Sequence, residues 1–275
     1  MSKQQPIIEL SDGNRIPQLG LGVWQASPEQ AASAVRQALQ AGYRHIDTAA
    51  IYENEEGVGQ GLQEAGVPRE QVFITTKVWN SEQGFDSATR ALDASLARLK
   101  LDYVDLLLIH WPTPAKDRYV ETWKALIQAR EQGKVRSIGV SNFNPEHLQR
   151  LIDETGVTPV LNQIELHPSF QQRELRQAHE RLNIRTESWS PLGQGKGLEH
   201  PQIKQIASKH GRSPAQVIIR WHLQLGLIAI PKSVTESRIQ ENFQVFDFQL
   251  DADDLAAIAT LDAGERLGPN PATLN

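Results

Sequence analysis

The 275-residue chain contains no cysteine, and this absence excludes disulfide bonds, zinc–thiolate centres and thiol nucleophiles. No hydrophobic run approaches the ~20 residues that are needed to span a bilayer. Residues 1–10 also lack the charged-then-apolar pattern of a signal peptide. We therefore expect a cytoplasmic protein that has no membrane partner.

Runs of basic residues are absent too. The chain has 28 Lys and Arg against 33 Asp and Glu, a formal net charge of −5 that is spread along its length. Nucleic acids and anionic membranes need a concentrated positive surface, so neither is an expected partner. The histidines show no ligand spacing such as H-x-x-x-H, and no metal site is expected.

The order of apolar segments predicts alternating strands and helices in a single domain over residues 1–275. Several segments are continuous runs of Val, Ile and Leu, as in strands that are buried on both faces. The predicted strands are Leu19–Trp24, His45–Asp47, Val72–Val78, Val104–His110, Ser137–Ser141, Leu161–Glu165, Arg185–Trp189 and Leu227–Pro231. The predicted helices between and after them are Pro28–Ala41, Glu55–Ala65, Phe85–Leu99, Tyr119–Gln132, Pro145–Thr155, Gln172–Leu182, Pro214–Leu225 and Thr235–Phe243.

Eight such strand–helix units predict an α/β fold, the (β/α)8 TIM barrel. An N-terminal β-hairpin is expected before the barrel, because Ile7–Leu10 and Arg15–Pro17 flank the turn sequence Ser-Asp-Gly-Asn. Two extra helices are expected over His200–His210 and Ala252–Leu261. The alternative is an open doubly wound sheet, but that fold usually has fewer strands and a glycine-rich first turn.

Three consecutive predicted strands end on side chains that can do chemistry. Asp47, Lys77 and His110 stand at these ends, and Tyr52 lies in the loop after the first strand. The carboxyl ends of parallel strands meet at one rim of a barrel, where active sites form. The four side chains are therefore predicted to lie together as catalytic residues.

Tyr52 is the predicted proton donor of this group. A buried Lys77 needs a counter-ion, and Asp47 is its natural partner. The ordinary pKa of a tyrosine is about 10, and we expect the Lys77 ammonium to lower it, so that Tyr52 protonates a carbonyl oxygen near neutral pH. His110 is expected to hydrogen-bond that oxygen and stabilise developing negative charge.

Phosphate-binding features occupy the loops after the seventh and eighth predicted strands, where barrels frequently build such a site. The segment 190–195 contains two glycines, which let backbone N–H groups approach a phosphate. Lys232 and Ser233 follow the eighth strand. Arg238, on the next helix, is suited to hold an additional 2′-phosphate.

Tryptophans stand at the ends of several predicted strands. Trp24, Trp79 and Trp111 are predicted to line a substrate pocket at the rim, with core packing as the alternative. Trp189 ends the seventh strand and is either a core residue or a flat ring on which an aromatic cofactor ring stacks.

Three separated motifs resemble the signatures of the aldo-keto reductase family. The first is GYRHIDTA at residues 42–49, followed by Tyr52 and by Asn54-Glu55 and Val58-Gly59. The second is IGVSNF at residues 138–143. The third is IPKS at residues 230–233, followed by Arg238, Glu241 and Asn242. Together they extend over most of the chain in the family's order.

The resemblance implies a monomeric barrel that binds NADPH and reduces aldehydes or ketones to alcohols by hydride transfer. It places the family's catalytic tetrad on Asp47, Tyr52, Lys77 and His110. The implied cofactor contacts are Gly22, Val23, Trp24, Asp47, Ser141, Asn142, Gln163, Trp189, Ser190, Leu192, Gly193, Gln194, Lys232, Ser233, Val234, Arg238, Glu241 and Asn242. The implied substrate contacts are Trp24, Tyr52, Trp79, His110 and Trp111. Most members have Tyr at the stacking position, so Trp189 departs from the pattern but preserves stacking.

Within the family, three segments are similar to bacterial 2,5-diketo-D-gluconate reductases: PQLGLGVWQ at 17–25, LNQIELHP at 161–168 and the short tail around Arg266–Pro269. A short tail covers less of the barrel mouth than the long C-terminal loop of steroid-type members of the family. We therefore expect small polar substrates, such as 2,5-diketogluconate (to 2-keto-L-gulonate), methylglyoxal, β-keto esters and simple aldehydes.

Two other functions remain open from the sequence. A Schiff-base aldolase would use Lys77 as its nucleophile in a barrel. A non-catalytic NADPH-binding sensor or subunit would keep much of the tetrad without turning over a carbonyl.

Overall fold

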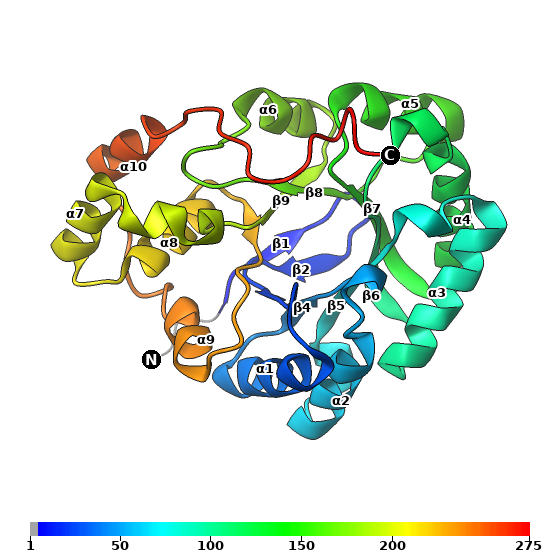
Figure 1. Cartoon of the computed structure of the whole chain (residues 1–275), viewed down its shortest axis with the longest axis horizontal. Coiled ribbons are helices and arrows are strands. Elements are labelled where there is room, and N and C mark those ends of the chain that lie inside the picture. Colours follow the sequence, from blue (N-terminus) through cyan, green and yellow to red (C-terminus); the bar gives the residue numbers. More distant parts are fainter. Residues whose placement is uncertain (1–4) are drawn as a thin grey trace.

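Eight parallel strands form a barrel with helices around it in the computed structural model, which describes residues 5–275 (Figure 1). The strands are β3 (Leu21–Gly22), β4 (His45–Asp47), β5 (Phe73–Val78), β6 (Val104–Ile109), β7 (Val135–Ser141), β8 (Leu161–Glu165), β9 (Arg185–Trp189) and β10 (Ile228–Ala229). They pair in chain order, and parallel bridges from Leu19 to Ala229 and from Gly22 to Lys232 bring the last strand next to the first. The predicted (β/α)8 barrel is confirmed.

The helices surround the sheet close to their predicted positions (Figure 1). They are α1 (Pro28–Ala41), α2 (Glu55–Ala65), α3 (Phe85–Leu99), α4 (Tyr119–Glu131), α5 (Pro145–Thr155), α6 (Arg173–Arg181), α8 (Pro214–Gln224) and α9 (Glu236–Phe243). The two extra helices are α7 (Pro201–His210) and α10 (Ala252–Ala259). Short 3₁₀ turns are η1 (Ala50–Tyr52), η2 (Arg69–Gln71), η3 (Asn80–Glu82), η4 (Pro114–Lys116) and η5 (Gly193–Glu199). The first and last barrel strands are shorter than predicted.

Local sequence sets where several helices begin. Ser27, Asn144 and Ser213 are N-caps of α1, α5 and α8, and each precedes a proline at the first helical position. Ser27 and Gln30 form a reciprocal capping box, which satisfies backbone N–H groups that have no partner inside the helix.

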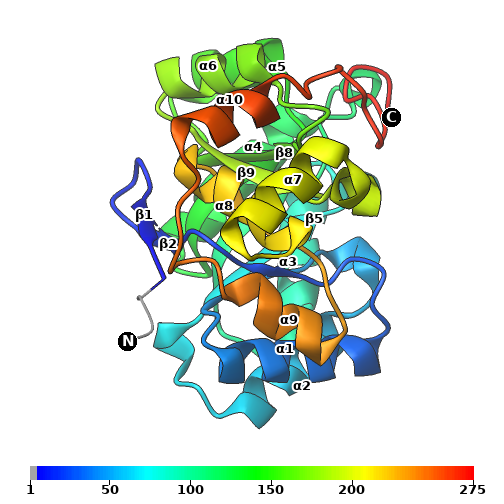
Figure 2. The ribbon, with the colours of Figure 1, turned by 90° about the vertical axis from the view of Figure 1, so that its left-hand side faces the viewer.

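The two ends of the barrel differ. The hairpin of β1 (Ile7–Glu9) and β2 (Arg15–Pro17) lies at one end, and the C-terminal tail lies at the other (Figure 2). Leu10 and Ile16 of the hairpin region pack with Leu106, Leu161 and Ile228, and these side chains fill the floor of the barrel. The open end is therefore the one that receives the carboxyl ends of the strands.

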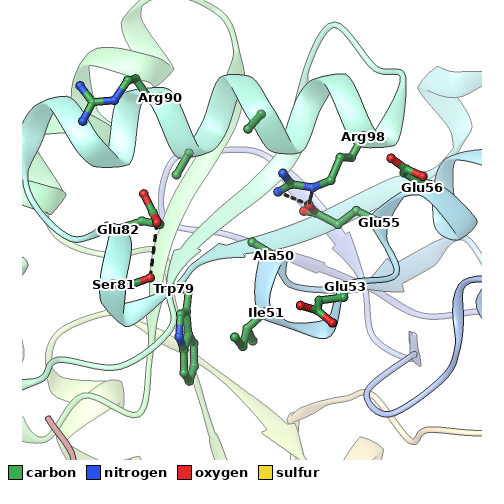
Figure 3. Close-up of a pocket in the computed structure, with 12 residues that line it drawn as sticks. Ala50, Ile51, Glu53, Glu55, Glu56, Trp79, Ser81, Glu82, Arg90 and Arg98 are labelled. Carbon is green, nitrogen blue, oxygen red and sulfur yellow. Dashed lines mark hydrogen bonds and ion pairs between the residues drawn. The ribbon is translucent and has the colours of Figure 1, made fainter.

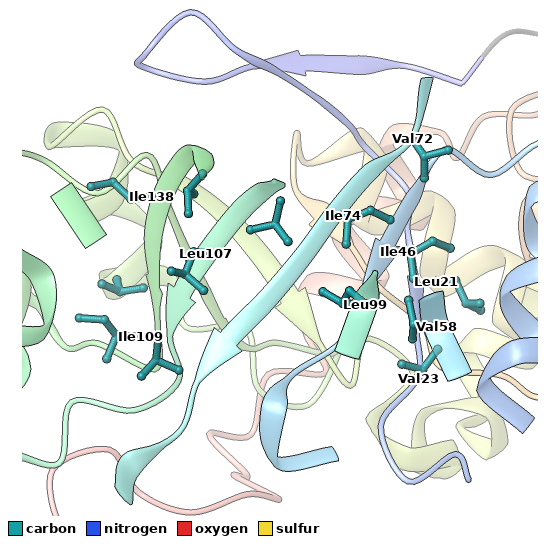
Figure 4. Close-up of a cluster of buried hydrophobic side chains, with 14 of the residues drawn as sticks. Leu21, Val23, Ile46, Val58, Val72, Ile74, Leu99, Leu107, Ile109 and Ile138 are labelled. Atoms are coloured by element: carbon teal, nitrogen blue, oxygen red, sulfur yellow. The ribbon is translucent and has the colours of Figure 1, made fainter. Parts of the chain in front are cut away.

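Strand alternation separates an apolar layer from a polar interior. Ile46, Ile74 and Leu107 belong to the hydrophobic cluster that the helices cover (Figure 4). Residues one position away point to the opposite side because successive side chains on a strand face opposite ways. This places His45 and Asp47, on either side of Ile46, in the interior, where both are buried.

We predict that Gly61→Ala lowers the free energy of unfolding by about 1–3 kcal/mol, although alanine is the better helix former. An added Cβ would lie 2.5 Å from the Ala32 carbonyl oxygen and 2.8 Å from Val35 Cβ, both on α1. Urea denaturation measures the change. Gln63→Ala, at an exposed position of the same helix, is the control, and its expected change is below about 0.5 kcal/mol. Equal effects would contradict a requirement for close α1–α2 packing.

Candidate active site

A cavity of about 480 Å³ opens at the carboxyl ends of the strands. Each of the eight barrel strands, or the loop that follows it, contributes at least one residue to the cavity wall. The lining residues are Gly22, Trp24, Gln25, Asp47, Ile51, Tyr52, Trp79, His110, Trp111, Ser141, Asn142, Gln163, Trp189, Ser190, Gln194, Ile230, Lys232, Gly268, Pro269 and Leu274. The cavity thus contains three of the four predicted catalytic side chains, and the fourth, Lys77, lies beneath it.

Asp47, Lys77 and Tyr52 form a connected group. The Lys77 Nζ atom donates to Asp47 Oδ1 at 2.6 Å, to the Thr48 carbonyl at 2.9 Å and to Tyr52 Oη at 3.4 Å. Lys77 and Asp47 are 1% and 2% exposed, so the ion pair lies out of water. Burial lowers the pKa of Lys77, but Asp47 and Tyr52 outweigh it and the pKa is raised. The ammonium is therefore charged at neutral pH.

Lys77 acts on Tyr52 in the expected direction, but the expectation that the pKa of Tyr52 is lowered overall is wrong. Burial raises the pKa of this phenol, and the opposing effect of Lys77 is smaller. The charge of Asp47 also raises it, since Asp47 lies beside Lys77 and offsets its field. Tyr52 therefore holds its proton at neutral pH.

His110 stands beside Tyr52 with its ring edge-on, the ring centroids 5.8 Å apart. Burial and the nearby charge of Lys77 hold the pKa of His110 well below its usual range, so the imidazole is neutral. Its Nδ1 atom has no hydrogen-bond partner among residues 5–275. A neutral ring of this kind presents one N–H that can donate to a carbonyl oxygen.

Polar groups on neighbouring strand ends form one side of the cavity. Trp189 Nε1 donates to Asn142 Oδ1 at 2.8 Å, and Asn142 Nδ2 donates to the His110 carbonyl at 3.0 Å. Ser141 Oγ donates to the Gln163 carbonyl at 2.8 Å. Asn142 has a φ of 62°, an uncommon left-handed conformation for a residue other than glycine. These bonds fix the half-buried ring of Trp189 in one orientation.

The predicted phosphate residues lie on two neighbouring loops. Ser190, Gly193 and Gln194 follow β9 with φ values of 48°, 58° and 53°, and the Gly193 and Gly195 N–H groups donate to carbonyls within this turn. Lys232 and Arg238, after β10, are exposed cations. Only Ser190, Gln194 and Lys232 of these residues line the cavity.

The remaining predicted cofactor residues lie outside the cavity wall. Val23 is fully buried in the hydrophobic core. Leu192 and Val234 are partly buried and pack against that core. The others stand on the segment from β10 to α9: Ser233 and Asn242 are buried, and Glu241 is half-buried.

Trp24, Trp79 and Trp111, which the sequence predicts to line a substrate pocket, lie around the cavity. Trp79 packs edge-on against His110, with ring centroids 5.0 Å apart, and Trp111 is nearly parallel to His110 at 6.5 Å. Trp24 is 43% exposed and stands at the cavity mouth. All three line the cavity together with Trp189.

The C-terminal tail is part of the site, and its anchor was missed from the sequence. Glu165, at the end of β8, accepts from the Leu267 N–H at 2.6 Å, the Gly268 N–H at 2.9 Å and His167 Nε2 at 2.9 Å. Gly268 lies against the Trp189 ring, where an added Cβ would be 2.5 Å from Cη2. The signal in the sequence was an acid at the end of a strand with no assigned role.

A larger groove of about 720 Å³ lies beside this cavity and shares Ile51 and Trp79 with it (Figure 3). The buried acid of this groove is Glu55. Arg98 forms an ion pair with it at 2.7 Å, so the charge of Glu55 is balanced. The groove lacks the other predicted site residues. The chemistry therefore belongs to the smaller cavity.

The other histidines do not gather around a possible metal. Within residues 5–275 no group of three His, Asp or Glu side chains is placed to hold an ion. None of the helices in this range is both long and apolar enough to cross a membrane.

Lys77 is also poorly placed for the aldolase alternative. Its amine is fully enclosed and donates to three oxygens, so no lone pair is free to attack a carbonyl.

Comparison with known proteins gives concordant sequence and structure matches. The sequence model of the Aldo/keto reductase family matches residues 18–263. Methylglyoxal reductase DkgA of Escherichia coli (strain K12) is 59% identical over 267 residues, which cover 96% of each chain. An aldo/keto reductase from Brucella melitensis matches with a TM-score of 0.92 at 59% identity, over 94% of this chain and 100% of the other. A Gox0644 mutant in complex with NADPH gives a TM-score of 0.96 at 54% identity, over 99% and 100%.

We predict that Glu165→Gln loosens the tail. Burial raises the pKa of Glu165, but hydrogen bonds from His167 and the tail outweigh it and lower the pKa, so these bonds act on a carboxylate. Removing the charge weakens them, and amide exchange at residues 267 and 268 should rise about ten-fold. Hydrogen–deuterium exchange measures this. In the wild type, the tail should loosen only when Glu165 becomes protonated. Because its pKa is lowered, this happens at a pH below the ordinary glutamate value near 4.5. Glu174→Gln, at an exposed position, is the control and should change nothing.

Proposed function

The chain belongs to the aldo/keto reductase family, and we propose that it reduces small, polar carbonyl compounds to alcohols with NADPH as the hydride donor. The observation that carries the proposal is the grouping of Asp47, Lys77, Tyr52 and His110 around one cavity. A proton donor, a cation beside it and a hydrogen-bond donor for an oxyanion are the groups that carbonyl reduction requires.

Tyr52 supplies the proton in this mechanism. The carbonyl oxygen lies within reach of Tyr52 Oη and the His110 ring, and His110 orients it through an N–H. NADPH, when bound, supplies the hydride to the carbonyl carbon. As negative charge grows on the oxygen, the phenol proton moves to it, and the phenolate that remains is stabilised by Lys77 Nζ at 3.4 Å. Asp47 holds Lys77 in place for this role.

The residues present fit NADPH in an extended pose. The Trp189 ring, held by Asn142, offers a face for the nicotinamide, and Ser141 and Gln163 stand beside it. The left-handed turn at 190–195 suits the pyrophosphate. Lys232 and Arg238 are exposed cations that would hold the 2′-phosphate. The fit supports NADPH over NADH.

The cavity size supports a small substrate. Its volume of about 480 Å³ is at the lower part of the range for small-molecule sites, and the tail residues Pro269 and Leu274 narrow its mouth. Methylglyoxal is thus a fitting substrate, as the name of the Escherichia coli relative suggests. 2,5-Diketo-D-gluconate and β-keto esters are of similar polarity. The cavity wall is complete within one chain, so a monomer would hold every group of the proposed site.

The experiment is NADPH oxidation, followed by absorbance, with a panel of these carbonyls. Turnover of several of them would support a reductase and rank its substrates. NADPH binding without turnover of any would contradict the proposal and favour a sensor.

We predict that Tyr52→Phe lowers kcat for methylglyoxal by about 10²–10⁴-fold, the range for loss of a positioned proton donor. NADPH affinity should stay within about three-fold, because the phenol hydroxyl faces the substrate. Steady-state kinetics and fluorescence titration measure the two quantities. Tyr103→Phe is the matched control, since its hydroxyl bonds Arg136 far from the cavity. Full activity in the Tyr52 variant would exclude its role as donor.

Arg238→Ala should raise the Kd of NADPH by about ten-fold or more and change that of NADH by less than two-fold. Only NADPH carries the 2′-phosphate that the guanidinium would hold. Arg181→Ala, another exposed arginine, serves as the control. Equal losses for both cofactors would show that Arg238 does not contact this phosphate.

A further inference from the structure

A second buried acid lies beneath the tetrad and has no role in the mechanism above. Glu187, on β9, is fully buried. The Gln163 Nε2 group donates at 2.8 Å both to Glu187 Oε2 and to Asp47 Oδ2, so one amide joins the two acids. Glu187 therefore connects to Lys77 and Tyr52 through Gln163 and Asp47.

The other oxygen of Glu187 faces His45. Glu187 Oε1 lies 3.5 Å from His45 Nε2, and neither atom has any other hydrogen-bond partner among residues 5–275. His45 Nδ1 is 3.2 Å from the Pro17 carbonyl oxygen. A carbonyl only accepts, so Nδ1 carries a hydrogen and a neutral His45 presents a lone pair at Nε2. An ionised Glu187 would then set two acceptors against each other.

We propose that Glu187 is a neutral acid that donates its proton toward His45 Nε2 and thereby positions Gln163 and Asp47 for catalysis. In this arrangement Glu187 Oε1 and His45 Nε2 become hydrogen-bond partners. The only ion pair among these buried side chains is then that of Lys77 and Asp47. The alternative places the proton on His45. It would bury a second ion pair, with the cation near Lys77 and the anion near Asp47, which burial disfavours.

The pKa directions agree with the geometry. Burial, followed by the charge of Asp47, raises the pKa of Glu187 to about 8. Burial also lowers the pKa of His45 to about 3. The titratable and charged groups that face Glu187 are His45 and Asp47 on β4, Lys77 on β5 and Tyr52 after β4. Gln163 on β8 faces it as a neutral amide.

A consequence for catalysis follows, and it rests on the proposed reductase function. When Glu187 ionises, its negative charge raises the pKa of Tyr52 further and makes the phenol a weaker acid. Reduction should therefore slow as the pH rises through about 8. Below that pH, Glu187 is neutral and Asp47 alone balances Lys77.

The first test needs no turnover, so it does not depend on the proposed reductase function. Infrared spectra of the wild-type protein, with ¹³C at glutamate carboxyls, should contain a protonated glutamate band at neutral pH that disappears as the pH rises through about 8. Glu187→Gln should lack the band, and Glu174→Gln, at an exposed position, should keep it. Absence of the band at neutral pH in the wild type would overturn the proposal, whether or not the chain reduces carbonyls.

The second test is the pH profile of kcat. Glutamine at 187 keeps an acceptor for Gln163 and a donor for His45 but does not titrate. The ratio of kcat in Glu187→Gln to that of the wild type should rise about three- to ten-fold between about pH 7 and pH 9. Glu187→Ala removes the contacts to both Gln163 and His45. The ratio of its kcat to that of the wild type should be low at every pH. If the pH profiles of kcat for wild type and Glu187→Gln run parallel, ionisation of Glu187 does not affect the acidity of Tyr52, and the proposed link is refuted.

Discussion

The buried ion pair between Lys77 and Asp47 is the interaction on which the interior of this barrel depends. Two charges at 2.6 Å inside a protein are tolerated only when each is paired and hydrogen-bonded. Thr48, Tyr52 and Gln163 supply the remaining bonds. Removing either ion would leave an unbalanced charge among buried groups, so the geometry of the site and the stability of the barrel are coupled at this point.

The ends of the barrel give this polar interior one exit. Apolar side chains of the hairpin and lower strands fill the floor. The tail, anchored on Glu165, narrows the opposite mouth and lies against Trp189. The tetrad is thus reached from one direction only, through a wall of aromatic rings. Lys77 and Asp47 are buried at the bottom of this site, and buried charges act on one another more strongly than charges at a surface.

Burial explains why the charge of Lys77 does not decide the acidity of Tyr52. A neighbouring ammonium favours the phenolate, but desolvation opposes the anion, and Asp47 cancels part of the field. The same competition raises the pKa of Glu187 and lowers those of His45 and His110. Glu187, His45 and His110 are therefore neutral at neutral pH, whereas Lys77 and Asp47, which bond each other directly, are charged.

The sequence by itself determined the barrel, its hairpin and its two extra helices, because the periods of strands and helices and the capping residues are local properties. It also predicted that Asp47, Tyr52, Lys77 and His110 share one rim, since consecutive parallel strands end at the same edge. Only the tertiary structure decided which residues support them. Glu165 and Glu187 are acids within predicted strands, and their partners lie 102 and 24 residues away in the chain. The protonation states of the site depend on burial, which no local pattern contains.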